Sequence, residues 1–220
     1  MMAVFEKGER LRHIGHLDIQ RAMQRALRRS GLPVAYSKGF NPHILVTFAS
    51  ALATGSWGSR EIMDVTMAQE TSPEAFVTAM NAALPPDMQL SEAKVLDDKH
   101  PALMAQLTAA DYTIRFTEGA QECIAAIPAF LEQESILAMR KTKSGMKETD
   151  IRPLIHSLEG EGETIHAVLT LTESLACKPD MLVKALSAFA GMENPPRVLV
   201  SRNGLLGQNA DGALVALDTL

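Results

Sequence analysis

The fold is decided by a ten-residue pattern that occurs twice: residues 71–80 read TSPEAFVTAM and residues 177–186 read CKPDMLVKAL, and the two align without a gap. In both copies a proline takes the first helical position, an acidic residue follows it, and apolar residues recur at helical spacing. A repeat at such a long separation is typical of a duplicated structural unit. We therefore expect two related halves, each with a helix at this point.

Strand-like runs flank both copies of this helix, and each half offers a further strand and helix upstream. The expected elements are, in chain order, strand 3–7, helix 18–30, strand 61–67, a helix from 71, strand 89–95, strand 111–116, helix 120–134, strand 167–172, a helix from 177 and strand 197–201. With a third strand after the first helix of each half, the order is βαββαβ, given twice. This order predicts an α+β fold of two ferredoxin-like halves related by duplication, each an antiparallel sheet with helices on one face.

The two halves are expected to meet near residue 105. Residues 97–101 read DDKHP and are the predicted linker. We therefore assign residues 1–104 to the N-terminal half and 105–202 to the C-terminal half, and we leave 203–220 as a tail. The length of 220 residues suits two domains of roughly 100 residues each.

The composition is that of an ordinary globular protein, with 46% hydrophobic and 21% charged residues. No apolar run approaches the roughly 20 residues that span a bilayer, and the N-terminus lacks the apolar core of a signal peptide, so we expect a cytoplasmic protein without membrane contact. Cys123 and Cys177 are the only cysteines. Two isolated cysteines argue against a disulfide scaffold, a structural zinc site or an iron–sulfur cluster, so we expect two buried thiols and no cofactor.

Charge is distributed unevenly along the chain. The formal net charge is −5, but residues 1–60 contain nine Lys and Arg against three Asp and Glu, a balance of +6. The remaining residues therefore carry −11. A basic segment on an acidic protein predicts a surface that meets an anionic partner.

The helix expected over residues 18–30 concentrates this basic charge. Arg21, Arg25 and Arg28 fall on one side of it, with Arg29 at their flank, and Asp18 is the expected N-cap. No acidic residue follows any of these arginines within four positions in the helix, so they repel one another. The stripe is either a solvated surface or a site for an external anion. The opposite, apolar face is expected in the core and consists of Ile19, Ala22, Met23, Ala26 and Leu27.

Residues 36–43, YSKGFNPH, form a second candidate segment. Their Asn41-Pro42 pair favours a shaped turn between two strands. Phe40 and His43 could stack on a base or a planar cofactor while Lys38 and Asn41 contact phosphate, which is how single-stranded nucleic acid is held. The alternative is a structural loop with Phe40 folded inward.

Titratable residues gather at the entry to the first helix and in this loop, namely His13, His16, Asp18 and His43. Capping and hydrogen bonding in the core are the plainer interpretation. General acid–base catalysis by His16, Asp18 and His43 is the alternative, and we expect no metal site.

Two further loops carry groups that could meet an anion. Residues 55–61, GSWGSRE, match neither a Walker A nor a dinucleotide-binding motif, so we expect a hairpin-like connection there. In the second half, a basic loop occupies nearly the place that residues 36–43 have in the first. This loop is either solvated or a second anion contact, and its candidate residues are Arg140, Lys141, Lys143 and, just beyond it, Arg152.

A set of motifs is specific enough to suggest a family: residues 15–18, 25–33 and 36–43, Gly55 with Ser59 and Glu61, and residues 150–153. Together they resemble the radical-SAM-linked protein family, a domain of unknown function fused to, or encoded beside, cobalamin-type radical-SAM enzymes. In that family Ser commonly stands where this chain has Gly15, and Gln where it has Lys38. The resemblance implies an accessory role beside a radical-SAM partner. Because this chain has no Cys-x-x-x-Cys-x-x-Cys, the cluster and the radical chemistry would belong to that partner chain.

Three functions compete. The first is an accessory binding module that grips an anionic substrate, RNA or a ribonucleoprotein, through the arginine stripe and the 36–43 loop, and presents it to a radical-SAM enzyme. The second is an enzyme that uses His16, Asp18 and His43 around a substrate held by Arg28 or Arg29. The third is a protein–protein adaptor whose basic face meets an acidic surface of the partner enzyme.

Overall fold

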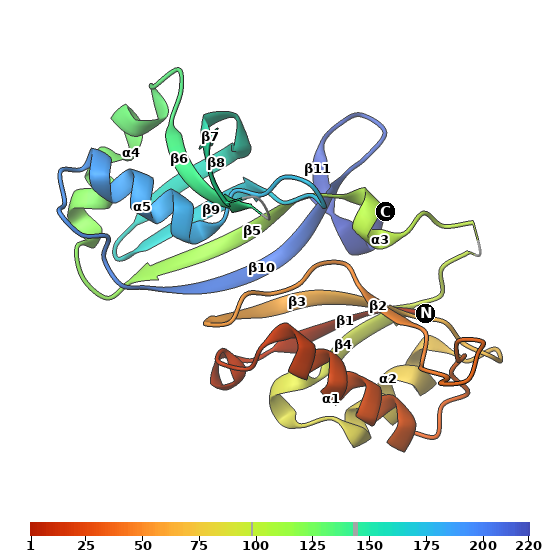
Figure 1. The fold of residues 1–220 in the computed structure, drawn as a ribbon. Coiled ribbons are helices and arrows are strands. Elements are labelled where there is room, and N and C mark those ends of the chain that lie inside the picture. The colour runs from red at the N-terminus through yellow and green to blue at the C-terminus, as the bar shows by residue number, and fades with distance from the viewer. Residues whose placement is uncertain (98, 143–144) are drawn as a thin grey trace. The chain divides into compact units, whose positions relative to one another are not determined.

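The computed structural model describes residues 1–97, 99–142 and 145–220, and it has a mixed α+β fold (Figure 1). The chain forms two compact units. The first consists of Met1–Leu107 together with Gly207–Leu220, and the second of Thr108–Leu206. Among the described helices, none is long and apolar enough to cross a membrane.

The first unit follows the predicted order of strands and helices. It contains β1 (Met2–Lys7), η1 (Glu9–Leu11), α1 (His16–Arg29), β2 (Val46–Phe48), β3 (Ser56–Val65), α2 (Pro73–Ala83), η2 (Pro86–Met88), β4 (Leu90–Lys94), α3 (Leu103–Gln106), β11 (Leu214–Ala216) and η4 (Leu217–Thr219). Its strands lie in the order β4-β1-β3-β2. The strand β1 is antiparallel to both β3 and β4, and β2 is antiparallel to β3.

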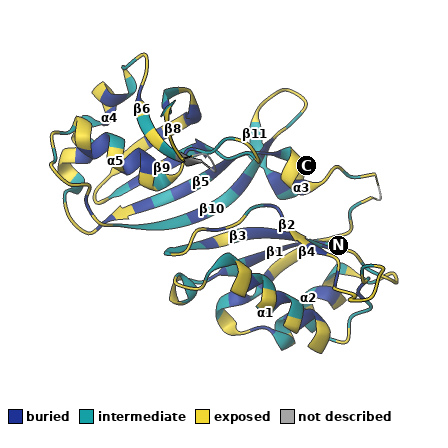
Figure 2. Ribbon diagram, viewed as in Figure 1, coloured by how far each residue is buried: buried dark blue, intermediate teal, exposed yellow. Residues whose placement is uncertain are grey.

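The helices α1 and α2 cover one face of this sheet and form the core of the first unit with it (Figures 1 and 2). The predicted apolar face of α1 is confirmed, because Ile19, Met23, Ala26 and Leu27 are all buried. Phe76 and Met80 of α2 are buried in the same cluster. The strands contribute Ala3, Phe5, Met63 and Val65 to it.

Two local expectations in this unit were wrong. Helix α1 begins at His16 with Gly15 at the N-cap, so Asp18 lies inside the first turn and is not the N-cap. Residues 55–61 are not a hairpin-like connection, because Ser56–Val65 form the ten-residue strand β3. The turn ends at Gly55, whose φ of +96° is one that glycine adopts without strain.

The second unit has the same order of elements with one insertion. It contains β5 (Leu107–Phe116), whose first residue belongs to the first unit, α4 (Ala120–Leu131), β6 (Leu137–Thr142), β7 (Gly145–Asp150), η3 (Arg152–Leu154), β8 (Ile155–Glu161), β9 (Thr164–Thr170), α5 (Pro179–Phe189) and β10 (Val198–Gln208), whose last two residues also belong to the first unit. Its strands lie in the order β10-β5-β9-β8, and β9 is antiparallel to both β5 and β8. The insertion is the antiparallel hairpin β6–β7, where the sequence led us to expect a loop.

The repeated pattern that predicts α2 and α5 is confirmed in both units. Pro73 and Pro179 each occupy the first position of their helix, where a missing N–H costs nothing. The Oγ of Ser72 accepts a hydrogen bond from the N–H of Ala75 at 3.2 Å and caps α2. The core of the second unit lies between α4, α5 and the apolar face of β5, which consists of Tyr112, Ile114 and Phe116.

The predicted tail, residues 203–220, is divided between the two units. Gly207–Leu220 belong to the first unit, where Leu217 is buried and the guanidinium of Arg60 bonds the carboxylates of Asp218 and, at 2.5 Å, Glu92. The burial of Leu217 and the bonds of Arg60 hold this segment against the first unit. Of the predicted linker 97–101, Asp98 lies outside the described residues.

Candidate functional site

The exposed face of α1 carries the arginines that the helical spacing predicts. Arg21, Arg25, Arg28 and Arg29 are all exposed, on the side opposite the buried apolar stripe. The side chains at i, i+4 and i+7 lie on one face of a helix, so the first three form one row. This row is called the arginine face below.

The members of the arginine face differ in their partners. Arg21 is paired with the carboxylate of Asp18 at 2.9 Å. Asp18 precedes Arg21 by one helical turn, whereas the expectation from the sequence concerned only acidic residues that follow each arginine. The Nε of Arg25 donates to the carbonyl of Arg21 at 3.3 Å. Within residues 1–97, 99–142 and 145–220, neither Arg25 nor Arg28 has a carboxylate within 4.0 Å. Arg25 and Arg28 are therefore the cations best placed to meet an external anion.

Arg29 has a structural role at the end of a neighbouring helix. Its guanidinium donates to the carbonyl of Ala83, the last residue of α2, at 2.8 Å. The last carbonyls of a helix lack intrahelical partners and carry partial negative charge, so a cation there is stabilising. Arg29 thus fastens α1 to the end of α2.

The segment between α1 and β2 forms a small hairpin that presents an aromatic ring. Tyr36 bridges Ile44, and the N–H of Ser37 donates to the carbonyl of His43 at 2.8 Å. The Oγ of Ser37 lies 2.8 Å from Nδ1 of the His43 ring. Phe40 is fully exposed, so it does not fold inward. Lys38 and Asn41 are exposed beside it.

A small cavity, called the α1 cavity below, lies beneath the start of α1. Its surface is almost entirely apolar, and the residues around it are the polar Lys7, His16, Ser50 and Glu61 and the apolar Phe5, Ile19, Phe48 and Leu52. The cavity volume is about 10 Å³. The His16 ring packs edge-on against Phe48, with ring centroids 5.3 Å apart.

Lys7 and Glu61 are buried charged residues, exposed by only 1% and 4%. The Nζ of Lys7 donates to the carbonyls of Ser56 at 2.9 Å and Arg12 at 3.2 Å. The register of β1 and β3 shifts between Phe5 and Lys7, and such bulges redirect side chains. A Cβ at Gly58 would collide with the Glu61 carboxylate, so any side chain there must displace it. Strand pairing, the register shift and this glycine together place Glu61 beside the cavity.

The three residues weighed for acid–base catalysis occupy different surroundings. His16 lines the cavity, whereas Asp18 is exposed and paired with Arg21, and His43 is bonded to Ser37 in the hairpin. Lys7 and Glu61 are the polar neighbours that sequence reasoning missed, although Glu61 belongs to the motif set. In the part of the chain that the structure describes, no group of three or more His, Cys, Asp or Glu could hold a metal ion.

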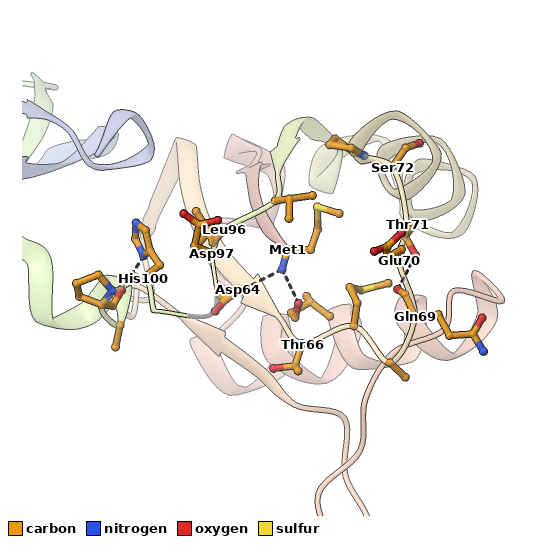
Figure 3. Close-up of a pocket in the computed structure, with 17 residues that line it drawn as sticks. Met1, Asp64, Thr66, Gln69, Glu70, Thr71, Ser72, Leu96, Asp97 and His100 are labelled. Carbon is orange, nitrogen blue, oxygen red and sulfur yellow. Dashed lines mark hydrogen bonds and ion pairs between the residues drawn. The ribbon is translucent and has the colours of Figure 1, made fainter.

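A larger cavity of about 910 Å³ lies elsewhere on the first unit (Figure 3). Its charged side chains are the carboxylates of Asp64, Glu70 and Asp97, with His100 nearby, and no Arg or Lys is among its described lining residues. The amino group of Met1 donates to the Val65 carbonyl at 2.8 Å and lies 3.3 Å from the Asp64 carboxylate. This cavity is acidic and would repel an anion that the arginine face attracts.

Two of the basic residues predicted in the second unit are engaged in its own structure. Arg140 donates to the carbonyl of Ser174 at 3.2 Å. The Nε of Arg152 donates to the carbonyl of Leu131, the last residue of α4, at 2.9 Å, as Arg29 does for α2. Lys143 lies outside the described residues, and so does the side chain of Lys141.

Asp150 gives the base of the β6–β7 hairpin a pH-dependent contact. Its carboxylate accepts the N–H groups of Ile136 at 2.9 Å and Arg152 at 3.0 Å, and these bonds hold the pKa of Asp150 below its ordinary value of 3.8. Because the pKa of Asp150 is lower in the folded protein than in the unfolded chain, its ionised carboxylate stabilises the fold at pH values above 3.8. This stabilisation is lost as the pH falls through the lower pKa of the folded state. We expect Asp150→Asn to be less stable than wild type near neutral pH, with the difference shrinking below about pH 4.

This prediction is checked by urea unfolding from about pH 7 to 3. Asp211→Asn, in an exposed turn, is the control and should track the wild type throughout. A stability difference for Asp150→Asn that stays constant with pH would contradict the assignment.

Both cysteines are buried, as the sequence predicts. Burial raises the pKa of the Cys177 thiol to about 12, with a smaller contribution from Asp180, and burial likewise raises that of Cys123. The thiolate is the reactive form, so we expect no alkylation of the native protein by iodoacetamide at about pH 8 and two modifications in denaturing urea. Mass spectrometry gives the count, and rapid labelling of the native protein would contradict the prediction.

Comparison with known proteins identifies a family. Residues 1–185 match the model of a family described as "Uncharacterized protein conserved in bacteria (DUF2344)". No curated protein matches the chain. The matched range contains the arginine face, the 36–43 hairpin, the α1 cavity and the β6–β7 hairpin.

Proposed function

Since the chain belongs to the family DUF2344, whose description assigns no activity, we propose its function from its own geometry: it is a binding module for single-stranded RNA. The observation that carries this proposal is the arginine face, on which Arg25 and Arg28 stand exposed without a carboxylate partner among the described residues. The phosphate backbone dominates the affinity of proteins for nucleic acid, and exposed guanidinium groups are its usual partners.

The hairpin adds the second element that such recognition uses. A fully exposed phenylalanine is unusual in water, but it offers a platform on which a base can stack. Lys38 and Asn41 flank this ring and can reach a phosphate or a base edge. Stacking contributes roughly 1–3 kcal/mol per base without demanding a sequence, so the proposed module grips RNA broadly.

We also propose that the two units are ferredoxin-like halves related by duplication. Support comes from the order βαββαβ, which the first unit follows directly and the second follows once β6–β7 is set aside. Further support comes from the matching strand orders, β4-β1-β3-β2 and β10-β5-β9-β8, in which corresponding strands take corresponding places. In both units the second helix starts with Pro followed by an acidic residue.

The RNA is proposed to be presented to a radical-SAM enzyme on a separate chain. The proposal of this partner rests on the motif resemblance, whose residues include Arg25 and Arg28 of the arginine face. Co-purification with such an enzyme, retained after nuclease treatment and lost in an arginine-face variant, would instead favour a protein–protein adaptor. Co-purification abolished by nuclease supports RNA as the link.

The proposal is tested by measuring binding of a fluorescein-labelled single-stranded RNA at increasing salt. A phosphate-reading surface releases counterions, so the logarithm of the association constant should fall linearly with the logarithm of the salt concentration, by about 0.7 per phosphate contacted. Absent binding at low salt, or binding indifferent to salt, would reject the proposal.

A further inference from the structure

The larger, acidic cavity of the first unit lies where the strand β1 begins (Figure 3). In the sheet β1 is placed between β4 and β3, and its first residue, Met2, pairs with Lys94 on one side and Asp64 on the other. Both neighbours run antiparallel to β1, so the chain that follows them continues past its start. These continuations, residues 66–73 and 95–97, line the cavity. The cavity is therefore a gap in the line of β1.

The size of this gap suits one further extended chain. Neighbouring strands lie about 4.8 Å apart, so the two strands that flank β1 are separated by about 9.6 Å at its start. One strand fills a space of that width. The cavity volume of about 910 Å³ is also large enough for a peptide segment, since sites that hold ligands measure roughly 300–1,000 Å³.

Met67 directs its backbone N–H and C=O groups into the gap. In extended backbone these groups point alternately to the two sides of the chain. Val65 exchanges hydrogen bonds of 2.8 and 2.9 Å with Met1, and Thr66 bonds the segment before β2 on the opposite side. Met67 then faces the side of Met1 again, and no described residue bonds its N–H or C=O. Unpaired groups of this kind bind an added strand.

The charges that line the gap select a basic occupant. The amino group of Met1 engages Asp64, but neither Glu70 nor Asp97 has a cation within 4.0 Å in the described part of the chain. Figure 3 shows these two carboxylates on either side of Met1, so they call for separated cations. Alternate side chains of a strand lie about 6.6 Å apart on one face, so two Lys or Arg residues of an extended segment provide such a spacing.

We propose that this cavity docks an extended segment of a partner protein in which Lys or Arg alternates with apolar residues. The segment continues the line of β1, bonds the backbone of Met67 and places its cations beside Glu70 and Asp97. Its apolar side chains pack on the apolar lining, which includes Val95 and Leu96. The docking site goes beyond RNA binding, and none of its lining residues belongs to the arginine face or the 36–43 hairpin.

The test measures binding of a fluorescein-labelled, amidated peptide, Lys-Val-Lys-Val-Lys-Val-Lys, to the full chain by fluorescence anisotropy at low salt. Saturable binding is expected. The N–H groups of the Val residues lie on one side of the extended peptide and those of the Lys residues on the other. N-methylation of one of these two sets should weaken binding at least about tenfold, because it removes the donors that face Met67 and keeps every charge. The charge-reversed peptide, with Glu in place of Lys, should not bind.

Variants and hydrogen exchange locate the bound peptide. Glu70→Gln/Asp97→Asn should weaken binding by about three- to tenfold, because each exposed ion pair contributes a few-fold in affinity. Glu118→Gln/Glu161→Gln removes the same charge from exposed positions of the second unit and should stay within about twofold of the wild type. In NMR, the peptide should slow hydrogen exchange of the Met67 amide.

Each possible result supports or overturns the docking site. If both N-methylated peptides bind as tightly as the parent peptide, charge alone holds the peptide and strand docking is overturned. Equal weakening in the two double variants, or unchanged exchange of the Met67 amide, overturns it as well. Absence of peptide binding also overturns the docking site, and it leaves the RNA proposal standing because that proposal is tested with a different ligand.

Discussion

The double variant Arg25→Ala/Arg28→Ala is expected to bind single-stranded RNA on the order of a hundredfold more weakly than the wild type at low salt. Both guanidinium groups are exposed and, among the described residues, lack a carboxylate partner, so their removal costs the fold little. A hydrogen bond to a charged group contributes about 1.5–3 kcal/mol, which is at least about tenfold in affinity for each arginine.

The salt dependence of binding separates this loss from unfolding. Removing two phosphate contacts should make the salt slope shallower by about 1.4, since each contact on a single strand contributes about 0.7. Lys184→Ala/Arg197→Ala removes the same charge from exposed positions of the second unit and is the matched control. If the control weakens binding as much as the arginine pair does, net charge rather than the arginine face is responsible.

Lys7→Met is expected to lower the free energy of unfolding by about 3–5 kcal/mol. Lys7 and Glu61 are buried opposite charges that line the same cavity, and removing one such charge while the other stays buried costs about this much. The carbonyls of Arg12 and Ser56 also lose a donor. Such a loss is a large part of the roughly 5–15 kcal/mol that stabilises a typical domain. Urea unfolding measures it as a lower midpoint at an unchanged slope.

A second substitution tests whether the buried charge is the cause. In Lys7→Met/Glu61→Leu both charges are replaced by apolar groups, and such replacements of whole pairs are often neutral or stabilising. We therefore expect the double variant to recover most of the stability that Lys7→Met loses. Lys94→Met, at an exposed position of β4, should stay within about 0.5 kcal/mol of the wild type. Equal destabilisation in the single and double variants would show that packing, rather than charge, dominates.

The helices could be predicted because local chemistry determines them. The start of α2 follows from Pro73 with the apolar spacing behind it, and the arginine face follows from periodicity within one helix. The start of α1 was misplaced because Asp18 is a good N-cap by type, whereas the structure puts Gly15 there. Strand β3 was cut short because Gly55 and Gly58 suggest a loop, and long-range pairing of Gly58 with Lys7 overrides that preference.

The site was less predictable because its contacts join distant segments. The sequence shows that residues 29 and 152 are arginines, but it does not show what they contact. Their bonds to the helix-terminal carbonyls of Ala83 and Leu131 appear only in the tertiary structure. Lys7 and Glu61 lie 54 positions apart, and a strand register with a shift brings both into one cavity. Periodicity carries no information about such a register. The sequence singles out His16 at the entry to the helix, but it does not name the residues that surround it in the cavity.

Gly58 leaves room for the buried Glu61 carboxylate beneath the start of α1. Any side chain at this position must displace that carboxylate, and among the described residues within 4 Å it would meet neither the arginine face nor the Phe40 hairpin. A chain of this family with a larger residue at the corresponding place should therefore be repacked beneath the start of α1 and keep both exposed surfaces. Variation at this one position would then report how well the interior tolerates change, independently of the hold on nucleic acid.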